Sequence, residues 1–448
     1  MTETLQKANG TWRDRVMHRD ILRIAVPSIV SNVTVPLLGL VDVTITGHMG
    51  AAAYIGAIAV GGMIFNMMYW LCGFLRMSTG GFASQAFGAG LADESRRVLL
   101  RALQVALGLG LLFIVFQIPI RSLALFIMSP SPMVESYVLQ YFAVLVWGAP
   151  AVLATFVFNG WFLGMQNARV PMIVAITQNV VNILLSLLFV VGLGMKVEGV
   201  ALGTLIAQYV GVALSVAFCV RLYGAPWQHK DLRGLWKDNA LARFFSANSD
   251  IFLRTLFMVA VQVWFTSRGA HQGDTILAVN ALLMQLFLLF SYFMDGFAYA
   301  GEALAGRFAG GRDFTSLRRL TLCLFVWGVA LTALFMLVYW LGGAPFLSLL
   351  TDNATVVEAA EPYLLFAVLI PACGCAAFLF DGLFVGLIAT RQMLVAVLLA
   401  AIVYFALCAA LMPVMGNAGL WLSLLAFLSV RGLVQAVLYP RILRRLAE

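Results

Sequence analysis

Long stretches of hydrophobic residues, separated by short polar segments, dominate the chain. A helix that crosses a membrane needs about 20 apolar residues. The stretches that reach this length are 24–48, 52–78, 98–120, 134–158, 171–191, 198–222, 250–270, 276–300, 318–340, 360–384, 392–412 and 416–438. They are continuously apolar and do not alternate, which favours helices over the strands of a barrel. The pattern therefore predicts an all-α integral membrane protein with about twelve transmembrane helices.

The composition points to the same class. Of the 448 residues, 62% are hydrophobic and 11% are charged, whereas a soluble domain carries roughly a quarter charged residues. Lipid must therefore solvate much of the surface. The six cysteines fall within predicted spans, where we expect apolar fillers and not disulfides or metal ligands. The first apolar run is too long for a secretory signal, so we expect it to remain as the first span.

The basic residues are distributed unevenly between the two predicted sides of the membrane. With the N-terminus in the cytoplasm, 22 of the 28 Lys and Arg residues fall on the cytoplasmic side and 3 on the other, while Arg76, Arg254 and Arg431 sit near span ends. This asymmetry follows the positive-inside rule and puts both termini in the cytoplasm. We therefore expect the basic residues behind the net charge of +8 to set the membrane orientation and to contact lipid headgroups, and not to bind nucleic acid.

The two halves of the chain repeat each other. Phe158–Gly164 recurs as Phe380–Gly386, and the segments at 87–90 and 142–145 recur at 308–311 and 366–369. Six spans per half preserve orientation, so we expect two pseudo-symmetric six-helix bundles, with a substrate site between them and alternating access by rocking. The expected parts are an N-terminal arm, an N-lobe, a cytoplasmic linker, a C-lobe and a cytoplasmic tail, at residues 1–23, 24–222, 223–249, 250–440 and 441–448.

Asp42 is the sharpest candidate for ion coupling. An unpaired charge at mid-bilayer costs at least about 2.5–3.5 kcal/mol, so this carboxylate must face the bundle interior or a cavity. There it could carry a proton or, with nearby oxygens, hold Na⁺. Pro27 and Pro36 predict a bend in the same helix, which would let protonation act as a switch. The alternative is a static Asp42 that is hydrogen-bonded to Thr44, Thr46 or a neighbouring helix.

Uncharged polar residues form a stripe on the fifth and sixth spans. Such a stripe either lines a hydrated cavity opposite Asp42 or joins the helices together, and both readings stay open. The residues in the fifth span are Gln178, Asn179, Asn182 and Ser186, and those in the sixth are Thr204 and Gln208.

Two aspartates fall within apolar stretches of the second half. Asp295 and Asp381 are candidates for a second cation site or for binding a cationic substrate, and pairing with an Arg or a hydroxyl is the alternative. Glu302, at the end of the eighth span, is expected to be a solvated or headgroup residue.

The sequence contains no signature of nucleotide or enzyme chemistry. The G-x-x-x-x-G-K-[ST] pattern of an ATP motor is absent, and no Ser/His/Asp or metal-ligand cluster emerges. We expect no enzyme activity, no cofactor and no metal site beyond weak Na⁺ binding at Asp42. A membrane-embedded lipid-modifying enzyme is a rival reading, but it would need acids and bases clustered near one interface.

With these features together, the chain resembles transporters of the multidrug and toxic compound extrusion (MATE) family, in the DinF-like branch, from about Ile24 to Leu443. The matching segments are SNVTVPLLGLVD at 31–42, GH at 47–48, FLRMST at 74–79, QAFGA at 85–89, DGFAYA at 295–300, EA at 302–303, LWL at 420–422 and RGL at 431–433. The resemblance implies a MATE/MOP-type fold that exports lipophilic, often cationic compounds against H⁺ or Na⁺.

The resemblance also implies roles for residues of the first half. Asp42 matches the proposed coupling residue, whose protonation is linked to bending at Pro27. Asn182 and Thr204 match positions near it, but Ser186 stands where members have Asp, and the lost carboxylate favours protons over Na⁺. The other candidate cavity residues of the N-lobe are Asn32, Tyr141, Asn159, Gln178 and Asn179.

In the second half, Asp381 resembles an acidic position of the NorM-like branch. The seventh span offers only the neutral Gln262 as a partner, which disfavours a Na⁺ site in the C-lobe. Asp295, Asp381 and Gln262 are the candidates there.

The sequence therefore predicts an H⁺-coupled antiporter that exports lipophilic cationic small molecules across a bacterial inner membrane, as a lipid-embedded monomer. One alternative is a Na⁺-coupled drug antiporter. Another is a flippase for lipid-linked precursors from the same superfamily, which would need a basic central cavity, whereas the embedded charges here are mostly acidic.

Overall fold

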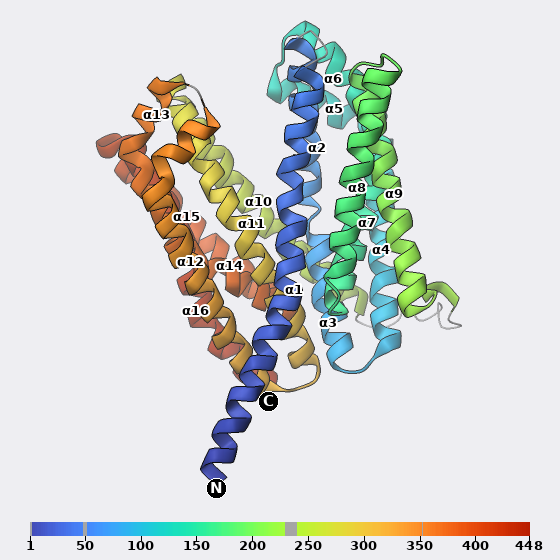
Figure 1. Cartoon of the computed structure of the whole chain (residues 1–448), viewed down its shortest axis with the longest axis vertical. Helices are drawn as coiled ribbons and strands as arrows, with labels where there is room; N and C mark the ends of the chain where they lie inside the picture. The colour runs from blue at the N-terminus through green and yellow to red at the C-terminus, as the bar shows by residue number, and fades with distance from the viewer. Residues whose placement is uncertain (1, 48–51, 229–239, 352) are drawn as a thin grey trace. The chain divides into compact units, whose positions relative to one another are not determined.

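The computed structural model describes residues 2–47, 52–228, 240–351 and 353–448, and this part of the chain is helical with no strand (Figure 1). It divides into two compact units. The N-terminal unit consists of residues 30–87 and 91–244, and the C-terminal unit of residues 1–29, 88–90 and 245–448. The first helix, α1 (Thr2–Gly47), thus contributes to both units, and the division falls just after Pro27.

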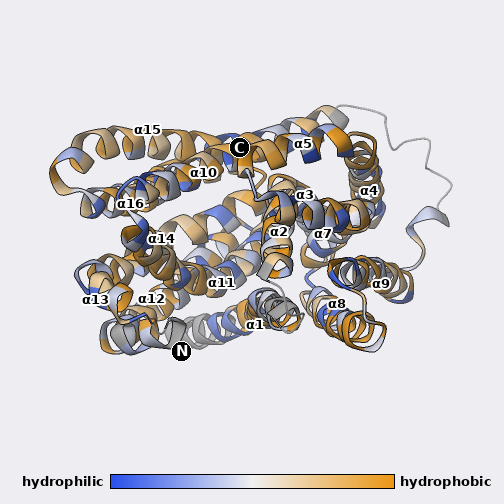
Figure 2. Cartoon of the chain, turned by 90° about the horizontal axis from the view of Figure 1, so that it is seen from above, coloured by the Kyte–Doolittle hydropathy of each residue, from blue (hydrophilic) through white to orange (hydrophobic). Residues whose placement is uncertain are grey.

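Eleven helical segments among the described residues are long and apolar enough to cross a membrane. Together with α1 they follow the twelve predicted spans in order, and hydrophobic residues dominate their ribbons (Figure 2). The eleven segments are Ala53–Gly88, Ala92–Val115, Pro132–Gly164, Arg169–Gly192, Val197–Tyr223, Ala242–Ala270, Asp274–Gly310, Phe314–Gly343, Ala354–Gly386, Thr390–Met415 and Asn417–Leu446. The predicted all-helical membrane fold is confirmed.

The N-terminal unit packs its helices in neighbouring pairs, with α2 against α6, α4 against α7 and α8 against α9. Beyond α1, its helices are α2 (Ala52–Leu71), α3 (Phe74–Gly88), α4 (Ala92–Val115), α5 (Gln117–Met128), α6 (Pro132–Leu145), α7 (Ala149–Gly164), α8 (Arg169–Leu187) and α9 (Val197–Tyr223). A π-helical turn, Leu188–Gly192, extends α8.

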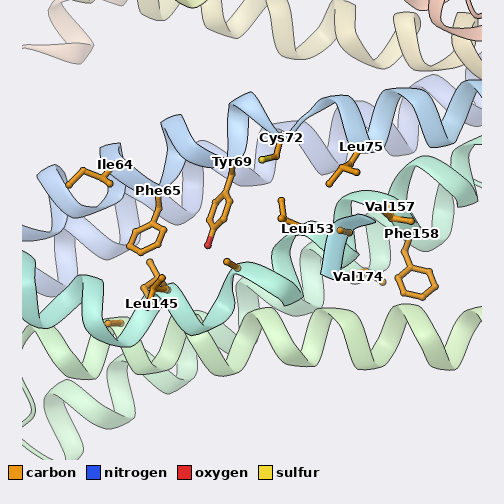
Figure 3. Close-up of a cluster of buried hydrophobic side chains, with 14 of the residues drawn as sticks. Ile64, Phe65, Tyr69, Cys72, Leu75, Leu145, Leu153, Val157, Phe158 and Val174 are labelled. Carbon is orange, nitrogen blue, oxygen red and sulfur yellow. The ribbon is translucent and has the colours of Figure 1, made fainter. Parts of the chain in front are cut away.

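A cluster of buried side chains holds this unit together (Figure 3). Phe65 and Tyr69 from α2 lie beside Leu145 from α6 and Leu153 from α7, and Phe65 stacks on Phe142 with ring centroids 5.0 Å apart. Aromatic rings bury large areas and pack best in offset or edge-on pairs. These contacts fix α2, α6 and α7 as the frame against which α8 and α9 lie.

The C-terminal unit is built around α14, which packs against α11, α12 and α16, while α15 packs against α16. Its helices are α10 (Ala240–Ala270), α11 (Asp274–Gly310), α12 (Phe314–Leu350), α13 (Ala354–Ala360), α14 (Leu364–Gly386), α15 (Thr390–Met415) and α16 (Asn417–Ala447).

The sequence repeat reappears as the same close helix packing in both units. A methyl group on Gly160 would overlap the backbone carbonyl of Arg76, and one on Gly382 would overlap the carbonyl of Ala298. The two pairs have the same spacing along the chain, so Gly382 and Ala298 are the counterparts of Gly160 and Arg76. Small residues let helix backbones approach closely inside a membrane. The contact of α7 with α3 is therefore repeated by α14 with α11.

Gly164 and Gly386 extend this correspondence by one helical turn. Gly164 faces the backbone of Gly80, and Gly386 faces that of Glu302, which is the counterpart of Gly80 in the repeat. Both glycines are required because a side chain would push the helices apart.

Three segments differ from the expected boundaries. The N-terminal arm is helical and continuous with the first span, because α1 begins at Thr2. Helix α10 begins at Ala240, well before the predicted start, so the linker is shorter than 223–249. Helix α16 continues to Ala447 and includes the expected tail. In each case polar residues lengthen a helix beyond its apolar window, which a hydropathy criterion does not detect.

Candidate functional site

The polar stripe of α8 meets α9 in a buried network. Asn182 donates a hydrogen bond from Nδ2 to Oγ1 of Thr204 at 2.9 Å, and Ser186 donates from Oγ to Oδ1 of Asn182 at 3.3 Å. Asn182 is 2% exposed and Ser186 is fully buried. Thr204 in turn donates to the carbonyl of Val200 at 3.0 Å, so its hydroxyl is oriented to accept from Asn182. The structure thus brings together three of the four residues expected at the coupling site.

Helix packing brings Ser186 very close to the backbone of α9. A methyl group on Gly203 would lie 2.8 Å from Oγ and 2.9 Å from the backbone nitrogen of Ser186. The absence of a side chain at Gly203 is therefore what allows the network to form between α8 and α9.

The same stripe also contacts α1. Asn179 donates from Nδ2 to the backbone carbonyl of Thr34 at 3.3 Å, and α1 and α8 lie side by side in both views (Figures 1 and 2). The stripe therefore joins helices, which is one of the two readings that the sequence left open.

The contact at Thr34 gives the register of α1 against α8. Helices α1 and α8 form the first and fifth spans, so they run in the same direction, and each rises about 1.5 Å per residue. Ser186 follows Asn179 by two helical turns, and residue 41 follows Thr34 by the same interval. In parallel helices this register puts residue 41 level with Ser186, and residue 42 lies one residue further along α1. The side chain of Asp42 itself lies outside the described residues.

The remaining N-lobe candidates are dispersed over several helices. Tyr141 on α6 is 5% exposed and packs edge-on against Phe65 at 6.4 Å between ring centroids. Asn159 on α7 buries its Oδ1, which accepts no hydrogen bond from the described residues. Gln178 on α8 faces Gly211 of α9, whose added methyl would lie 2.7 Å from Oε1. Pro27 and Asn32 are half-buried on α1, on either side of the division between the units.

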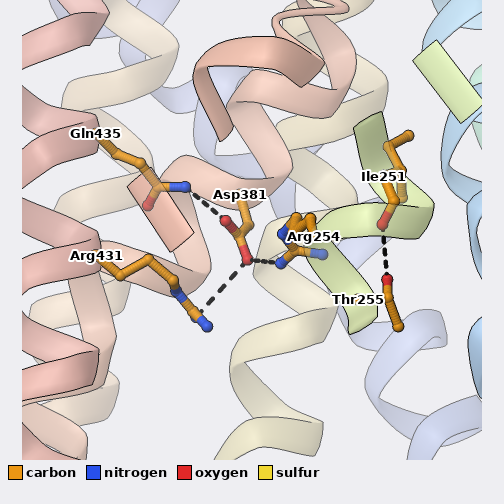
Figure 4. A network of polar contacts seen from close by, with 6 residues as sticks. All are labelled: Ile251, Arg254, Thr255, Asp381, Arg431 and Gln435. Carbon is orange, nitrogen blue, oxygen red and sulfur yellow. Dashed lines mark hydrogen bonds and ion pairs between the residues drawn. The ribbon is translucent and has the colours of Figure 1, made fainter. Parts of the chain in front are cut away.

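A second polar cluster lies in the C-terminal unit (Figure 4). Asp381 of α14 forms an ion pair and a hydrogen bond with Nη2 of Arg254 on α10. Nη2 of Arg431 on α16 lies 3.7 Å from the same carboxylate oxygen, and Gln435 donates from Nε2 to the other oxygen at 2.6 Å. For Asp381 the structure therefore shows arginine pairing, which is the predicted alternative to cation binding.

Arg254 and Arg431 are not near span ends, which corrects the depth expected from the sequence. Each lies mid-helix, in α10 and α16, and their side chains are only 8% and 2% exposed. The apolar window at 250–270 begins too late and the one at 416–438 ends too early, so both arginines are assigned to the wrong depth. A sequence signal for such buried arginines does exist. It is a basic residue within an apolar run, in a helix that continues into polar sequence.

The other C-lobe candidates have different surroundings. Asp295 on α11 is half-buried. Glu302 is 1% exposed, which contradicts the expected solvated position, because α11 continues to Gly310 and keeps it inside the bundle. Gln262 is exposed on α10, about two turns after Arg254, so Arg254 and not Gln262 is the α10 partner of Asp381.

The comparison with protein families decides which class this architecture represents. The sequence profile of the MatE family matches residues 27–188 and 251–410, one segment in each half. The chain belongs to the MATE family of membrane transporters. The two matched segments correspond to the two copies of the internal repeat. The repeat seen in the packing of α7 and α14 is therefore the repeat that the family profile matches twice.

Relatives place this MATE chain in the DinF-like branch. It is 38% identical over 427 residues to DNA damage-inducible protein F of Escherichia coli, covering 93% of this chain and 91% of that protein. It is 24% identical over 454 residues to a protein of Geobacillus kaustophilus named for multidrug resistance, NorM, covering 96% and 95%. The MATE transporter VcmN of Vibrio cholerae, solved in its bent form, has the same fold, with a TM-score of 0.84, 17% identity and coverage of 97% and 98%.

Proposed function

We propose that this MATE transporter is a proton-coupled antiporter that exports lipophilic cationic small molecules. The observation that supports the proposal is the hydrogen bond between Asn179 of α8 and Thr34 of α1, from which we infer that residue 42 lies near the level of the Asn182–Thr204–Ser186 network. A carboxylate inside the membrane is costly and is retained where it binds an ion or a substrate. Asp42 is accordingly the coupling residue, and the α8–α9 network forms its polar surroundings.

The choice of proton over Na⁺ rests on the number of carboxylates. Na⁺ is held by several oxygen ligands, and carboxylates raise the affinity of such a hard-cation site. The resemblance to the family implies an acid at this position, where this chain has Ser186, and the hydroxyl of Ser186 is already donated to Asn182. One carboxylate with neutral neighbours suits a proton better than a metal cation.

Alternating access is proposed to use α1 as the moving element. Helix α1 contributes residues 1–29 to one unit and continues into the other, and Pro27 lies two residues before the division. Proline removes a backbone hydrogen bond and permits a kink. Protonation of Asp42 would favour a bent α1 and release of the substrate outside, and loss of the proton to the cytoplasm would reset the helix. We place the protein in a bacterial inner membrane with both termini in the cytoplasm, and as a monomer among lipids.

Two other functions are weighed against this one. A flippase for a lipid-linked pyrophosphate would need positive side chains that are open to its substrate, whereas the side chains of Arg254 and Arg431 are buried against Asp381. A Na⁺-coupled exporter would use the same residues with a different ion. The relative named for multidrug resistance supports drug-like substrates in either ion mode.

Everted membrane vesicles test the proposal directly. A fluorescent lipophilic cation is offered with either a pH gradient or a Na⁺ gradient, and the other gradient is collapsed with an ionophore. Uptake that follows the pH gradient and ignores Na⁺ is expected. Uptake that persists on the Na⁺ gradient alone would replace the proton by Na⁺, and no uptake of cations under either gradient would overturn the exporter.

A further inference from the structure

Asp381 is a carboxylate in the membrane whose two oxygens are already bound by protein donors. Oδ2 contacts Arg254 and Arg431, and Oδ1 accepts from Gln435 at 2.6 Å. Asp381 is 13% exposed, and both arginine side chains are less so, at 8% and 2% (Figure 4). A metal cation at this carboxylate would compete with these donors for the two oxygens. The guanidinium of Arg254 is therefore placed where a bound cation would have to be.

Asp381 carries one negative charge and faces two positive side chains, of which Arg254 is the closer partner and Arg431 lies 3.7 Å away. Removal of Arg254 would leave Oδ2 with the more distant Arg431 as its cationic contact in this cluster. In a medium of low dielectric, a carboxylate that loses its close cationic partner is stabilised by a mobile cation or by a proton.

The repeat shows that this charge pair is specific to the C-terminal unit. The alignment of the two halves that pairs Gly160 with Gly382 also pairs the neighbouring Asn159 with Asp381. The N-terminal unit thus carries an amide where the C-terminal unit carries the acid that binds Arg254.

We propose that Arg254 acts as a built-in cation that occupies Asp381, excludes coupling ions from the C-terminal unit and so determines the ion stoichiometry of the transporter. The C-terminal unit would carry a latent site for a monovalent cation, of which Asp381 is the anionic ligand. The inference rests on the proposed ion-coupled transport for its consequence, but its binding step can be measured without transport.

The test compares Arg254→Gln with wild type in detergent. The apparent Tm of each purified protein is followed at pH 8 as NaCl replaces choline chloride at constant ionic strength. A ligand that binds only the folded state raises the Tm. We expect Na⁺ to raise the Tm of Arg254→Gln by about 3 °C or more beyond its effect on wild type. Arg268→Gln, on the exposed face of the same helix, is the matched control and should respond to Na⁺ as wild type does.

The double variant Arg254→Gln, Asp381→Asn keeps the proposal falsifiable if the single variant does not fold. It replaces the ion pair with two neutral amides, and should show the wild-type response to Na⁺ and the wild-type ion dependence of efflux. A folded Arg254→Gln that responds to Na⁺ as wild type does would overturn the proposal. A double variant that loses an ion dependence present in wild type would also overturn the proposal, because Asp381 would then already bind a coupling ion in the wild-type protein. If the wild-type protein exports no cations, that result contradicts the proposed function and leaves the binding experiment on Arg254→Gln unaffected.

Discussion

Asn182 of α8 and Thr204 of α9 share a hydrogen bond of 2.9 Å, from the side-chain amide to the threonine hydroxyl. Thr204→Val keeps the shape of the side chain and removes the acceptor, which leaves a buried N–H of Asn182 without this partner. We expect a loss of about 0.5–2 kcal/mol in stability and slower efflux, because the network near the level of residue 42 is disturbed. Thr204→Ser retains the hydroxyl and serves as the control. Equal Tm values and efflux rates for Thr204→Val and Thr204→Ser would refute a role for the bond.

Ser186→Asp should convert the ion preference. The new carboxylate would lie near the level of Asp42, and two acids at nearly one level repel each other unless a cation lies between them. We expect a variant that is destabilised in choline chloride, regains its Tm in NaCl and exports on a Na⁺ gradient. Ser186→Asn, which is nearly isosteric with Asp but uncharged, should show none of these Na⁺ effects. If both variants behave alike in the two salts, the carboxylate count does not select the ion.

Gly382→Ala tests the close packing that the repeat shares between the units. Its methyl group would overlap the carbonyl oxygen of Ala298 on α11, so the helices must separate, at a cost of about 1–3 kcal/mol. Gly342→Ala on α12 is the matched control, because nothing lies within 4 Å of its added methyl. The Tm should fall for Gly382→Ala and stay constant or rise for Gly342→Ala. A similar Tm for the two variants would mean that α11 and α14 are not in close contact.

The N-terminal part of α1 is held by a hydrogen bond from Nε1 of Trp327 to Nδ1 of His18, at 3.0 Å. A double-mutant cycle with His18→Ala and Trp327→Phe, measured as Tm at pH 8, should give a coupling energy of about 1 kcal/mol. Asp14 on α1 also approaches Arg319, at 3.6 Å. Such an exposed ion pair is worth little, so Asp14→Asn should change the Tm much less than Trp327→Phe. Additive effects of the two substitutions in the cycle would argue against the bond.

The spans and the repeat could be predicted from the sequence because they depend on local properties. An apolar run of about 20 residues has few alternatives to a membrane helix. Gly160 and Gly382 recur with the motif that surrounds them. The grouping of Asn182 with Ser186 could also be predicted from the sequence, since residues at i and i+4 share one face of a helix.

The C-terminal cluster could not be predicted because it depends on contacts between residues far apart in the chain. Arg254 and Asp381 are separated by 127 positions, and no periodicity relates them. Hydropathy windows are also shorter than the helices that contain them, which places Arg254, Arg431 and Glu302 nearer to water than they are. Charged residues that satisfy one another inside a bundle are the ones that a hydropathy criterion assigns to the wrong depth.

The central claim is that Asp42 carries the coupling proton, and efflux from proteoliposomes with Asp42→Asn tests it most directly. Asparagine has nearly the size of aspartate but does not titrate between pH 5 and 9. We predict that the variant folds with a Tm close to that of wild type, still binds the cationic dye, and loses transport driven by a pH gradient. Dye efflux at the wild-type rate, with the wild-type dependence on pH, would contradict the account.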